Sequence, residues 1–200
     1  MHIVCLDLEG VLVPEIWLAV AERTGIAELR LTTRDIPDYD VLMKKRIAIL
    51  GAHNITLSRI QQVIDAVEPL EGACDFLDLL RSKTQLIILS DTFTQFARPL
   101  MEKLGRPTLF CNELVVHGDR IVDYRLRQAN GKRHAVRALK SMGFEVLASG
   151  DSYNDIGMLQ EADHGVLFRP PERIIAEYPG FPAFTEYRQL SDMIELTLAG

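Results

Sequence analysis

The chain has 200 residues, 48% of them hydrophobic and 25% charged, which is typical of a soluble globular protein with enough chain to bury a core. Its net charge of -6, with Lys and Arg scattered along the chain, argues against non-specific binding to nucleic acid, and no apolar stretch is long enough to span a membrane. We expect no signal peptide. The widely spaced Cys5, Cys74 and Cys111 form no Cys-x-x-Cys motif, which favours reduced thiols in a cytoplasmic protein.

The chain begins with a short apolar stretch, residues 3–8, that ends in two carboxylates. This stretch predicts a buried strand, with Asp7 and Glu9 at its carboxyl end and their side chains on the same side. Gly10 lets the chain turn away at this point. Ligands bind at the carboxyl ends of strands in open α/β sheets, and adjacent carboxylates repel unless a cation, a phosphoryl group or a shared proton separates their roles. The sequence therefore predicts a ligand site at this edge.

The region after the first strand has helical patterns and no convincing strand. Apolar side chains keep helical spacing from Ile16 to a stop at Gly25, along one face of 39–50, and over 60–67 before Pro69. We expect a small helical bundle, residues 14–69, inserted into a core that consists of 1–13 and 70–200.

The rest of the chain alternates between strand and helix patterns. Helices are expected at about 73–83, 94–104, 132–142, 155–161, 172–177 and 189–199, and strands at 86–89, 109–111, 146–148 and 166–168, with a hairpin of 114–117 and 121–126. Strands that alternate with helices predict a doubly wound parallel sheet. The expected fold class is therefore α/β, with a doubly wound core and the inserted helical bundle.

Three further junctions between a strand and a helix carry polar side chains. Ser90-Asp91-Thr92 offers a hydroxyl and backbone N–H groups that suit an anion, and Lys132 begins a helix with a positive charge. Asp151 and Asp155 follow the next strand, four residues apart. Each feature alone has an ordinary explanation, because Ser90-Asp91-Thr92 could cap a helix and Lys132 could be a surface lysine. Together with Asp7 they offer the oxygen ligands and the positive charge that Mg²⁺ and a phosphate require.

At these residues the sequence resembles the haloacid dehalogenase-like hydrolases, and the resemblance covers the whole chain. The four motifs of that family appear here as Asp7-Leu8-Glu9-Gly10-Val11, Ser90, Lys132, and Gly150-Asp151 through Asp155. The helical insertion after the first motif is similar to the first type of cap domain in the family. One residue departs from the pattern, because Glu9 stands where most relatives have Asp.

Within this family the chain resembles the phosphoserine phosphatases, in which an acid and an Arg bind the substrate's amino and carboxylate groups. Glu15 and Arg46 hold those positions, and Asn154 matches an Asn beside the phosphate. Glu9 and three stretches are similar to the ThrH type, whose members also pass the phosphoryl group from phosphoserine to homoserine. These stretches are Pro14-Glu15-Ile16-Trp17, Thr33-Arg34-Asp35-Ile36-Pro37-Asp38-Tyr39 and Leu89-Ser90-Asp91-Thr92-Phe93.

The resemblance implies a role for each matched residue. Asp7 attacks the phosphorus and becomes an aspartyl phosphate, while Glu9 protonates the leaving oxygen and then takes a proton from the acceptor. The implied Mg²⁺ ligands are Asp7, the backbone carbonyl of Glu9, and Asp151; the implied phosphate-binding groups are Ser90, the Asp91 N–H, Lys132 and Asn154. Asp155 is expected to orient Lys132 or a metal-bound water.

The position of Arg46 points to an anion without any appeal to the family. It shares a helical face with Leu42 and Leu50, so an amphipathic helix would bury its guanidinium, which is costly unless an anion meets it. An internal partner such as Asp35 or Glu15 would satisfy it, and so would a substrate carboxylate bound bidentately. The sequence leaves both interpretations open.

Three alternatives to a phosphoserine phosphatase remain. A haloacid dehalogenase also uses an Asp nucleophile but has no need for an acidic residue at Glu9. A phosphatase for another small phosphomonoester is a closer alternative, and only the pair of Glu15 and Arg46 argues against it. A receiver domain also carries a phosphoacceptor Asp and a Lys, but is shorter and lacks the helical insertion. The expected partners are phosphoserine and homoserine, with no nucleic acid or membrane, and the sequence leaves monomer and homodimer open.

Overall fold

The computed structural model describes residues 1–32, 35–36 and 38–199. Thr33, Arg34 and Pro37, which belong to one of the ThrH-like stretches, lie outside the described residues. Within the described part, a seven-stranded sheet has the order β4-β3-β2-β1-β5-β6-β7. The strands are β1 His2–Leu6, β2 Gln85–Phe93, β3 Thr108–His117, β4 Arg120–Arg125, β5 Glu145–Gly150, β6 His164–Phe168 and β7 Ala183–Phe184. All neighbours are parallel except β3 and β4, so β1 is central and parallel to both β2 and β5.

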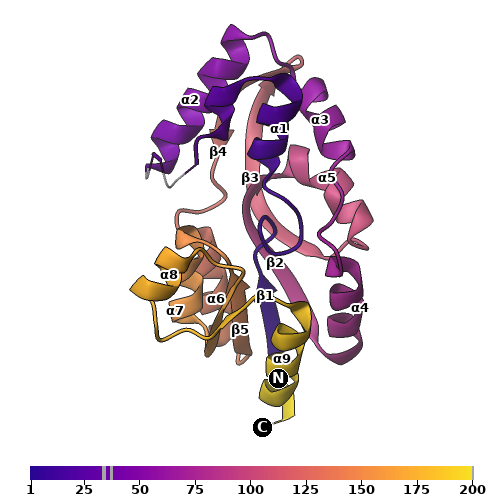
Figure 1. Cartoon of the computed structure of the whole chain (residues 1–200), viewed down its shortest axis with the longest axis vertical. Helices are drawn as coiled ribbons and strands as arrows, with labels where there is room; N and C mark the ends of the chain where they lie inside the picture. Colours follow the sequence, from indigo (N-terminus) through magenta and orange to yellow (C-terminus); the bar gives the residue numbers. More distant parts are fainter. Residues whose placement is uncertain (33–34, 37, 200) are drawn as a thin grey trace.

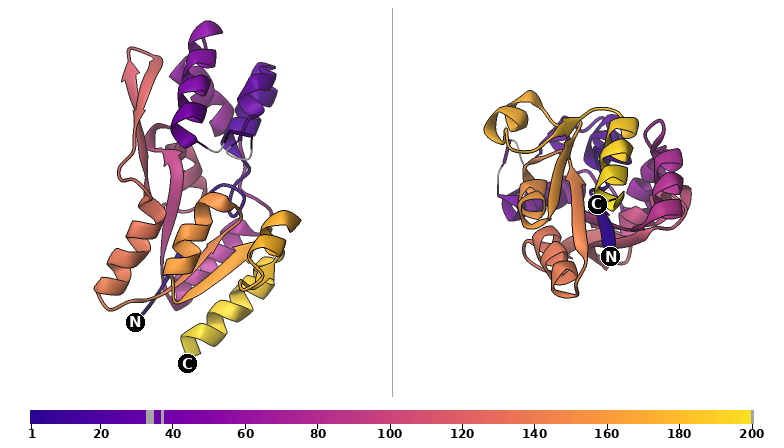
Figure 2. Two further views of the ribbon diagram at one scale, coloured as in Figure 1. Left: turned by 90° about the vertical axis from the view of Figure 1, so that its left-hand side faces the viewer. Right: turned by 90° about the horizontal axis from the view of Figure 1, so that it is seen from below.

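Helices cover both faces of this sheet (Figures 1 and 2). Side chains of β1 alternate between two apolar clusters, Val4 and Leu6 facing one way and Ile3 and Cys5 the other. The first cluster includes α4 Ala73–Lys83, α5 Thr94–Lys103 and α9 Tyr187–Ala199, and the second includes α6 Gly131–Ser141, α7 Ile156–Glu161 and α8 Glu172–Glu177. The predicted α/β class with a doubly wound sheet is confirmed.

The helices between β1 and α4 lie beyond the carboxyl ends of the strands, at the top of Figure 1. They are α1 Ile16–Thr24, the 3-10 helix η1 Ala27–Arg30, α2 Tyr39–Ala52 and α3 Leu57–Asp65. Local signals fix their ends: the Asp38 side chain accepts from the N–H of Val41 to begin α2, and Gly25, at φ 71°, ends α1. This position places a helical layer over the sheet edge that carries Asp7.

The hairpin of β3 and β4 runs alongside α2 and supports this helical layer (Figure 2, left). The Tyr124 hydroxyl donates to Asp40 Oδ1 at 2.7 Å, and the Ser58 N–H donates to Asp119 Oδ1 at 2.9 Å. The hairpin thus connects the sheet to both α2 and α3.

The strands differ from expectation near the site. The strand predicted at 86–89 continues to Phe93, but its pairing with β3 is irregular between Leu89 and Phe93. The two segments predicted at 109–111 and 114–117 form one strand, β3. Its polar centre is accommodated because the buried Asn112 side chain donates to the Asp91 carbonyl at 3.3 Å and accepts from the Arg127 N–H at 3.0 Å. The short β7 was not predicted.

No helix in the described part of the chain combines the length and the apolar character needed to cross a membrane.

Candidate active site

Asp7 lies directly after the central strand. Its N–H donates to the Ser149 carbonyl at 2.9 Å, which continues the pairing of β1 with β5 for one more residue. The side chain is 4% exposed, and its Oδ1 accepts from the Leu8 N–H at 2.7 Å. The fold therefore holds a buried carboxylate in a fixed direction at the middle of the sheet edge.

Lys132 connects two of the carboxylates. Its Nζ lies 2.8 Å from Asp7 Oδ1 and 2.7 Å from Asp155 Oδ1, and its side chain is 5% exposed. Burial disfavours the ammonium charge, but Asp155 and Asp7 outweigh it and raise the pKa of Lys132 well above its usual value. This lysine is the second residue of α6, and it stays charged between the two acids.

Asp151 and Asp155 follow β5 in a tight turn. Asp155 Oδ2 accepts from the N–H groups of Asp151 at 3.0 Å and Ser152 at 3.1 Å, so both oxygens of Asp155 have partners. Gly10, at φ 76°, comes so close that a Cβ there would lie 2.5 Å from Asp151 Oδ2. Glycine is therefore required where the loop after β1 meets the loop after β5.

These acids form a cluster that fits a hard cation. Ligand oxygens of Asp7, Asp151 and Asp155 all lie within 4.8 Å of one another. Burial and the neighbouring carboxylates raise the pKa of Asp7 well above its usual value and that of Asp151 to about 7. Lys132 balances one negative charge. The remaining buried carboxylate oxygens are the kind of ligand that Mg²⁺ takes from a protein.

Glu9 occupies a different part of the same loop. Its Oε2 accepts from the Ile16 N–H at 2.9 Å, at the start of α1. Burial and the nearby Glu15 raise the pKa of Glu9 to about 8. A carboxyl group with this pKa exchanges protons near neutral pH, which suits a general acid and base.

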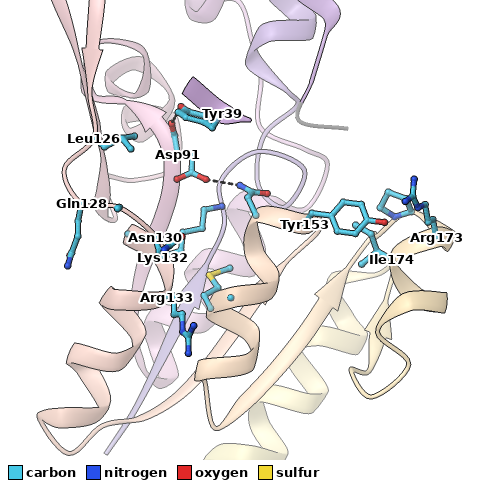
Figure 3. Close-up of a pocket in the computed structure, with 16 residues that line it drawn as sticks. Tyr39, Asp91, Leu126, Gln128, Asn130, Lys132, Arg133, Tyr153, Arg173 and Ile174 are labelled. Carbon is cyan, nitrogen blue, oxygen red and sulfur yellow. Dashed lines mark hydrogen bonds between the residues drawn. The ribbon is translucent and has the colours of Figure 1, made fainter. Parts of the chain in front are cut away.

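The segment 90–92 supplies polar groups to the cavity that Asp7 lines. Ser90 is buried and its Oγ accepts from the Thr92 N–H at 3.2 Å. Asn154 donates from Nδ2 to Asp91 Oδ2 at 2.9 Å, the dashed bond of Figure 3. The buried Thr92 hydroxyl has no hydrogen-bond partner among the described residues. Hydroxyl and amide groups therefore surround the space next to Asp7.

Arg46 lies on α2 with 7% of its surface exposed. Its Nη2 donates to the Leu31 carbonyl at 2.8 Å, and its Cζ lies 4.5 Å from the centre of the Trp17 ring. The Nε has no hydrogen-bond partner, and no carboxylate forms an ion pair with this guanidinium in the part of the chain that the structure describes, although Glu9 and Glu15 favour its charge. Of the internal partners considered from the sequence, Asp35 instead accepts from the Thr32 N–H at 2.9 Å. Burial lowers the pKa of Arg46 to about 10.

One cavity of about 270 Å³ brings most of the predicted site residues together. It is lined by Asp7, Glu9, Glu15, Arg46, Ser90, Asp91, Lys132, Asp151 and Asn154, while Asp155 lies outside this lining, behind Lys132. A wider groove of about 760 Å³ adjoins it along Tyr39, Asp91 and Lys132 (Figure 3).

Sequence reasoning missed two aromatic residues of this cavity. Tyr39 donates its hydroxyl to the Asp91 carbonyl at 3.0 Å, and Trp17 lies against the Arg46 guanidinium. A signal for Tyr39 was present, because it lies two turns before Arg46 on the same helical face. Nothing local identifies Trp17, since its contact with Arg46 depends on how α1 packs against α2.

Comparisons with known proteins agree with this geometry. Residues 1–163 match the family model of haloacid dehalogenase-like hydrolases. The chain is 57% identical over 191 residues to the phosphoserine phosphatase ThrH of Pseudomonas aeruginosa, covering 95% of this chain and 93% of that protein. It is 56% identical over 191 residues to a phosphoserine phosphatase of Pseudomonas syringae pv. tomato, covering 95% and 81%.

Two solved structures share the fold at low sequence identity. One is a phosphoserine phosphatase in apo form, with a TM-score of 0.78, 22% identity, and coverage of 97% of this chain and 98% of that chain. The other is a phospho-aspartyl intermediate analogue of phosphoserine phosphatase, with a TM-score of 0.76, 21% identity and 98% coverage of each chain. From the matched motifs, the family model and the high identity to the curated relatives, the chain belongs to the haloacid dehalogenase-like hydrolase family.

Proposed function

We propose that this protein is a Mg²⁺-dependent phosphoserine phosphatase that acts through an aspartyl phosphate on Asp7. The observation that carries the substrate assignment is Arg46, a buried guanidinium without a carboxylate partner among the described residues, in the same small cavity as Asp7. The names of the two curated relatives support the same substrate. A phosphomonoester without a carboxylate would leave the Arg46 charge buried and unpaired.

We also propose that residues 14–69 act as a cap over a core of 1–13 and 70–200. Helices α1 to α3 fall within the first range, which carries Arg46 and Glu15, whereas Asp7, Asp151 and Lys132 belong to the core. The substrate would thus bind between the two parts, with its phosphate toward the sheet and its amino-acid end toward the helices.

In the first half-reaction, a carboxylate oxygen of Asp7 forms a bond to phosphorus while the bond from phosphorus to the serine oxygen breaks. Glu9 gives its proton to that oxygen, so serine leaves as a neutral alcohol. In the second half-reaction, water attacks the phosphorus, Glu9 takes a proton from it, and Asp7 is released with inorganic phosphate. The raised pKa of Glu9, about 8, suits both directions of proton transfer.

Several groups bind the phosphate and the metal. Ser90, the Asp91 N–H, Asn154 and Lys132 are assigned to phosphoryl oxygens. Asp7, the Glu9 carbonyl and Asp151 would hold Mg²⁺, which neutralises the repulsion between Asp7 and the phosphate. Asp155 keeps Lys132 in place through its 2.7 Å contact.

At the other end of the substrate, Arg46 is assigned to the carboxylate and Glu15 to the ammonium group. Both side chains line the cavity, and Glu15 directly precedes α1. We further propose homoserine as a second phosphoryl acceptor, because it presents the same ammonium and carboxylate groups together with a hydroxyl. Glu9 in place of Asp supports this assignment through the ThrH resemblance.

A panel of phosphate esters with Mg²⁺ tests the proposal. Phosphoserine is compared with phosphoethanolamine, which lacks the carboxylate, and with the phosphate ester of 3-hydroxypropanoate, which lacks the ammonium group. Free phosphate and phosphohomoserine are followed separately, with and without homoserine. We expect the highest kcat/KM for phosphoserine. Equal values for phosphoethanolamine would favour a phosphatase for another small monoester.

A further inference from the structure

The loop after Asp7 is a compact turn that carries Glu9. The N–H groups of Leu12 and Val13 both donate to the Leu8 carbonyl, at 2.8 and 3.0 Å, and the Gly10 N–H donates to the Val13 carbonyl at 2.9 Å. Residues 8–13 thus form the first connection between the sheet and the helical layer. The position of Glu9 relative to Asp7 depends on this turn keeping its shape.

A side chain from the far end of the sequence holds this turn from outside. The Tyr187 hydroxyl, at the start of α9, donates to the Val11 carbonyl at 2.6 Å. Burial raises the pKa of this hydroxyl to about 12, so it remains a donor throughout the working pH range. The bond joins residues 176 apart in the chain.

The same tyrosine also contacts the second connection, through which the chain returns from α3 to the sheet. The Leu70 N–H donates to the Leu12 carbonyl at 2.9 Å, which ties the two connections to each other. Gly72, at φ 81°, ends the return and begins α4, and a Cβ there would lie 3.3 Å from Tyr187 Cδ2. The ring of Tyr187 therefore lies directly against Gly72.

Tyr187 is itself anchored to the core. Its ring stacks on Phe76 of α4 and on Phe168 at the end of β6, with centroids 4.9 Å apart in both pairs. Both phenylalanines are almost fully buried. The Arg169 guanidinium also lies 4.9 Å from the ring centre. The tyrosine is therefore fixed to the sheet and to α4 while its hydroxyl and one ring edge hold the two connections.

We propose that Tyr187 is a positioning residue that fixes both connections between the sheet and the helical layer, and through the 8–13 turn fixes Glu9 relative to Asp7. Tyr187 does not line the cavity, so its effect on turnover is indirect. The kinetic consequence rests on the proposed function, because it uses the assignment of Glu9 as the proton donor. The structural consequence, a looser turn without the hydroxyl, does not depend on it.

The structural consequence is tested by hydrogen exchange on the full chain. Tyr187→Phe keeps the stacked ring and removes only the bond to Val11. Tyr178→Phe is the matched control, since Tyr178 packs on Phe181 away from both connections. We expect the amides in 8–13, and the Leu70 amide that donates to Leu12, to exchange about fivefold faster in Tyr187→Phe, as the loss of one hydrogen bond predicts, and no change there in the control. Unchanged exchange, or a uniform increase over the whole chain, would overturn the proposal.

The kinetic consequence is tested with two substrates. For phosphoserine, whose leaving alkoxide needs a proton, we expect kcat/KM of Tyr187→Phe to fall severalfold, because kcat/KM reports the step in which Glu9 protonates the leaving group. For p-nitrophenyl phosphate, whose leaving group needs no proton, kcat/KM should stay close to that of the wild type, whereas kcat also contains the hydrolysis of the aspartyl phosphate, in which Glu9 acts for both substrates. Equal losses of kcat/KM on both substrates would show that Tyr187 acts only on general stability. If the wild type does not hydrolyse phosphoserine but the exchange result holds, the proposed function fails and the structural role of Tyr187 stands.

Discussion

Replacement of Arg46 by methionine should lower activity without lowering stability. Arg46 is buried with an unpaired Nε and no carboxylate partner among the described residues, so the folded protein bears a desolvation cost of several kcal/mol for this charge. Methionine fills a similar space without a charge. The change leaves the Leu31 carbonyl without its donor, a loss of about 1 kcal/mol, and removes the contact with Trp17, a loss of about 1 kcal/mol. We therefore expect the free energy of unfolding to be unchanged or higher.

The effect on activity should depend on the substrate's carboxylate. Loss of a bidentate bond to that group removes about 2–3 kcal/mol, or about a hundredfold in kcat/KM for phosphoserine. Phosphoethanolamine and an aryl phosphate lack the carboxylate, so their kcat/KM values should change little. Steady-state kinetics on the three esters, together with urea unfolding, measure both quantities on the same preparation.

Lys45→Met is the matched control, because Lys45 is the exposed neighbour on the same helix. It removes one positive charge from α2 without touching the cavity, and should leave unfolding and all three activities close to those of the wild type. The reasoning would be refuted if Arg46→Met unfolded more easily by about 2 kcal/mol or more and lost activity equally on the three esters. Such a result would mean that the guanidinium serves the packing of α1 against α2.

Three further predictions concern the carboxylate cluster. Asp7→Asn should abolish turnover while circular dichroism shows a folded protein, because an amide cannot act as the nucleophile; full activity in a folded variant would contradict this. Removal of metal with a chelator should stop turnover and Mg²⁺ should restore it, and metal-independent turnover would favour a dehalogenase. In metal-free protein the pKa of Asp151 rises from 3.8 in the unfolded chain to about 7 on folding. The folded state therefore binds more protons than the unfolded state between pH 3.8 and about pH 7. Over this range the contribution of Asp151 to the free energy of unfolding falls as pH rises. Thermal melts across this range should show a weaker pH dependence in Asp151→Asn, and an unchanged dependence would assign it to other groups.

The sheet could be predicted from the sequence because the signals for its strands and helices are local. Apolar runs, glycine stops and the alternation of strand and helix are enough to predict the order of elements, and the helix α4 begins and ends at the predicted residues 73 and 83. Asn112 shows where local signals fail. A polar residue in the middle of a strand looks like a break, but its side chain bonds to Asp91 and Arg127, and these partners are visible only in the folded chain.

The same distinction applies to the candidate site. The placement of acids and of Lys132 at strand ends follows from the sequence, because parallel strands bring those ends to one edge. The burial of Lys132 between two carboxylates does not follow, since it depends on how α6 packs against β2 and β5. Tyr187 is the extreme case. Nothing in its neighbourhood in the sequence connects it to Val11, and only the completed fold brings the last helix to the first loop.

The charged side chains that line the cavity indicate the charges of a matching ligand. At the sheet end, the single positive charge of Lys132 does not balance the three carboxyl groups of Asp7, Asp151 and Asp155. This end therefore attracts a cation. At the helical end, Arg46 is buried with an unpaired Nε, and Glu9 and Glu15 favour its charge without forming an ion pair with it among the described residues. A phosphorylated amino acid with Mg²⁺ complements both ends, because the cation and phosphate meet the acids and lysine while the carboxylate meets the arginine. We infer that the substrate and the metal each favour the binding of the other. A substrate anchored at Arg46 brings its phosphate to the metal, and the metal removes the repulsion between that phosphate and Asp7.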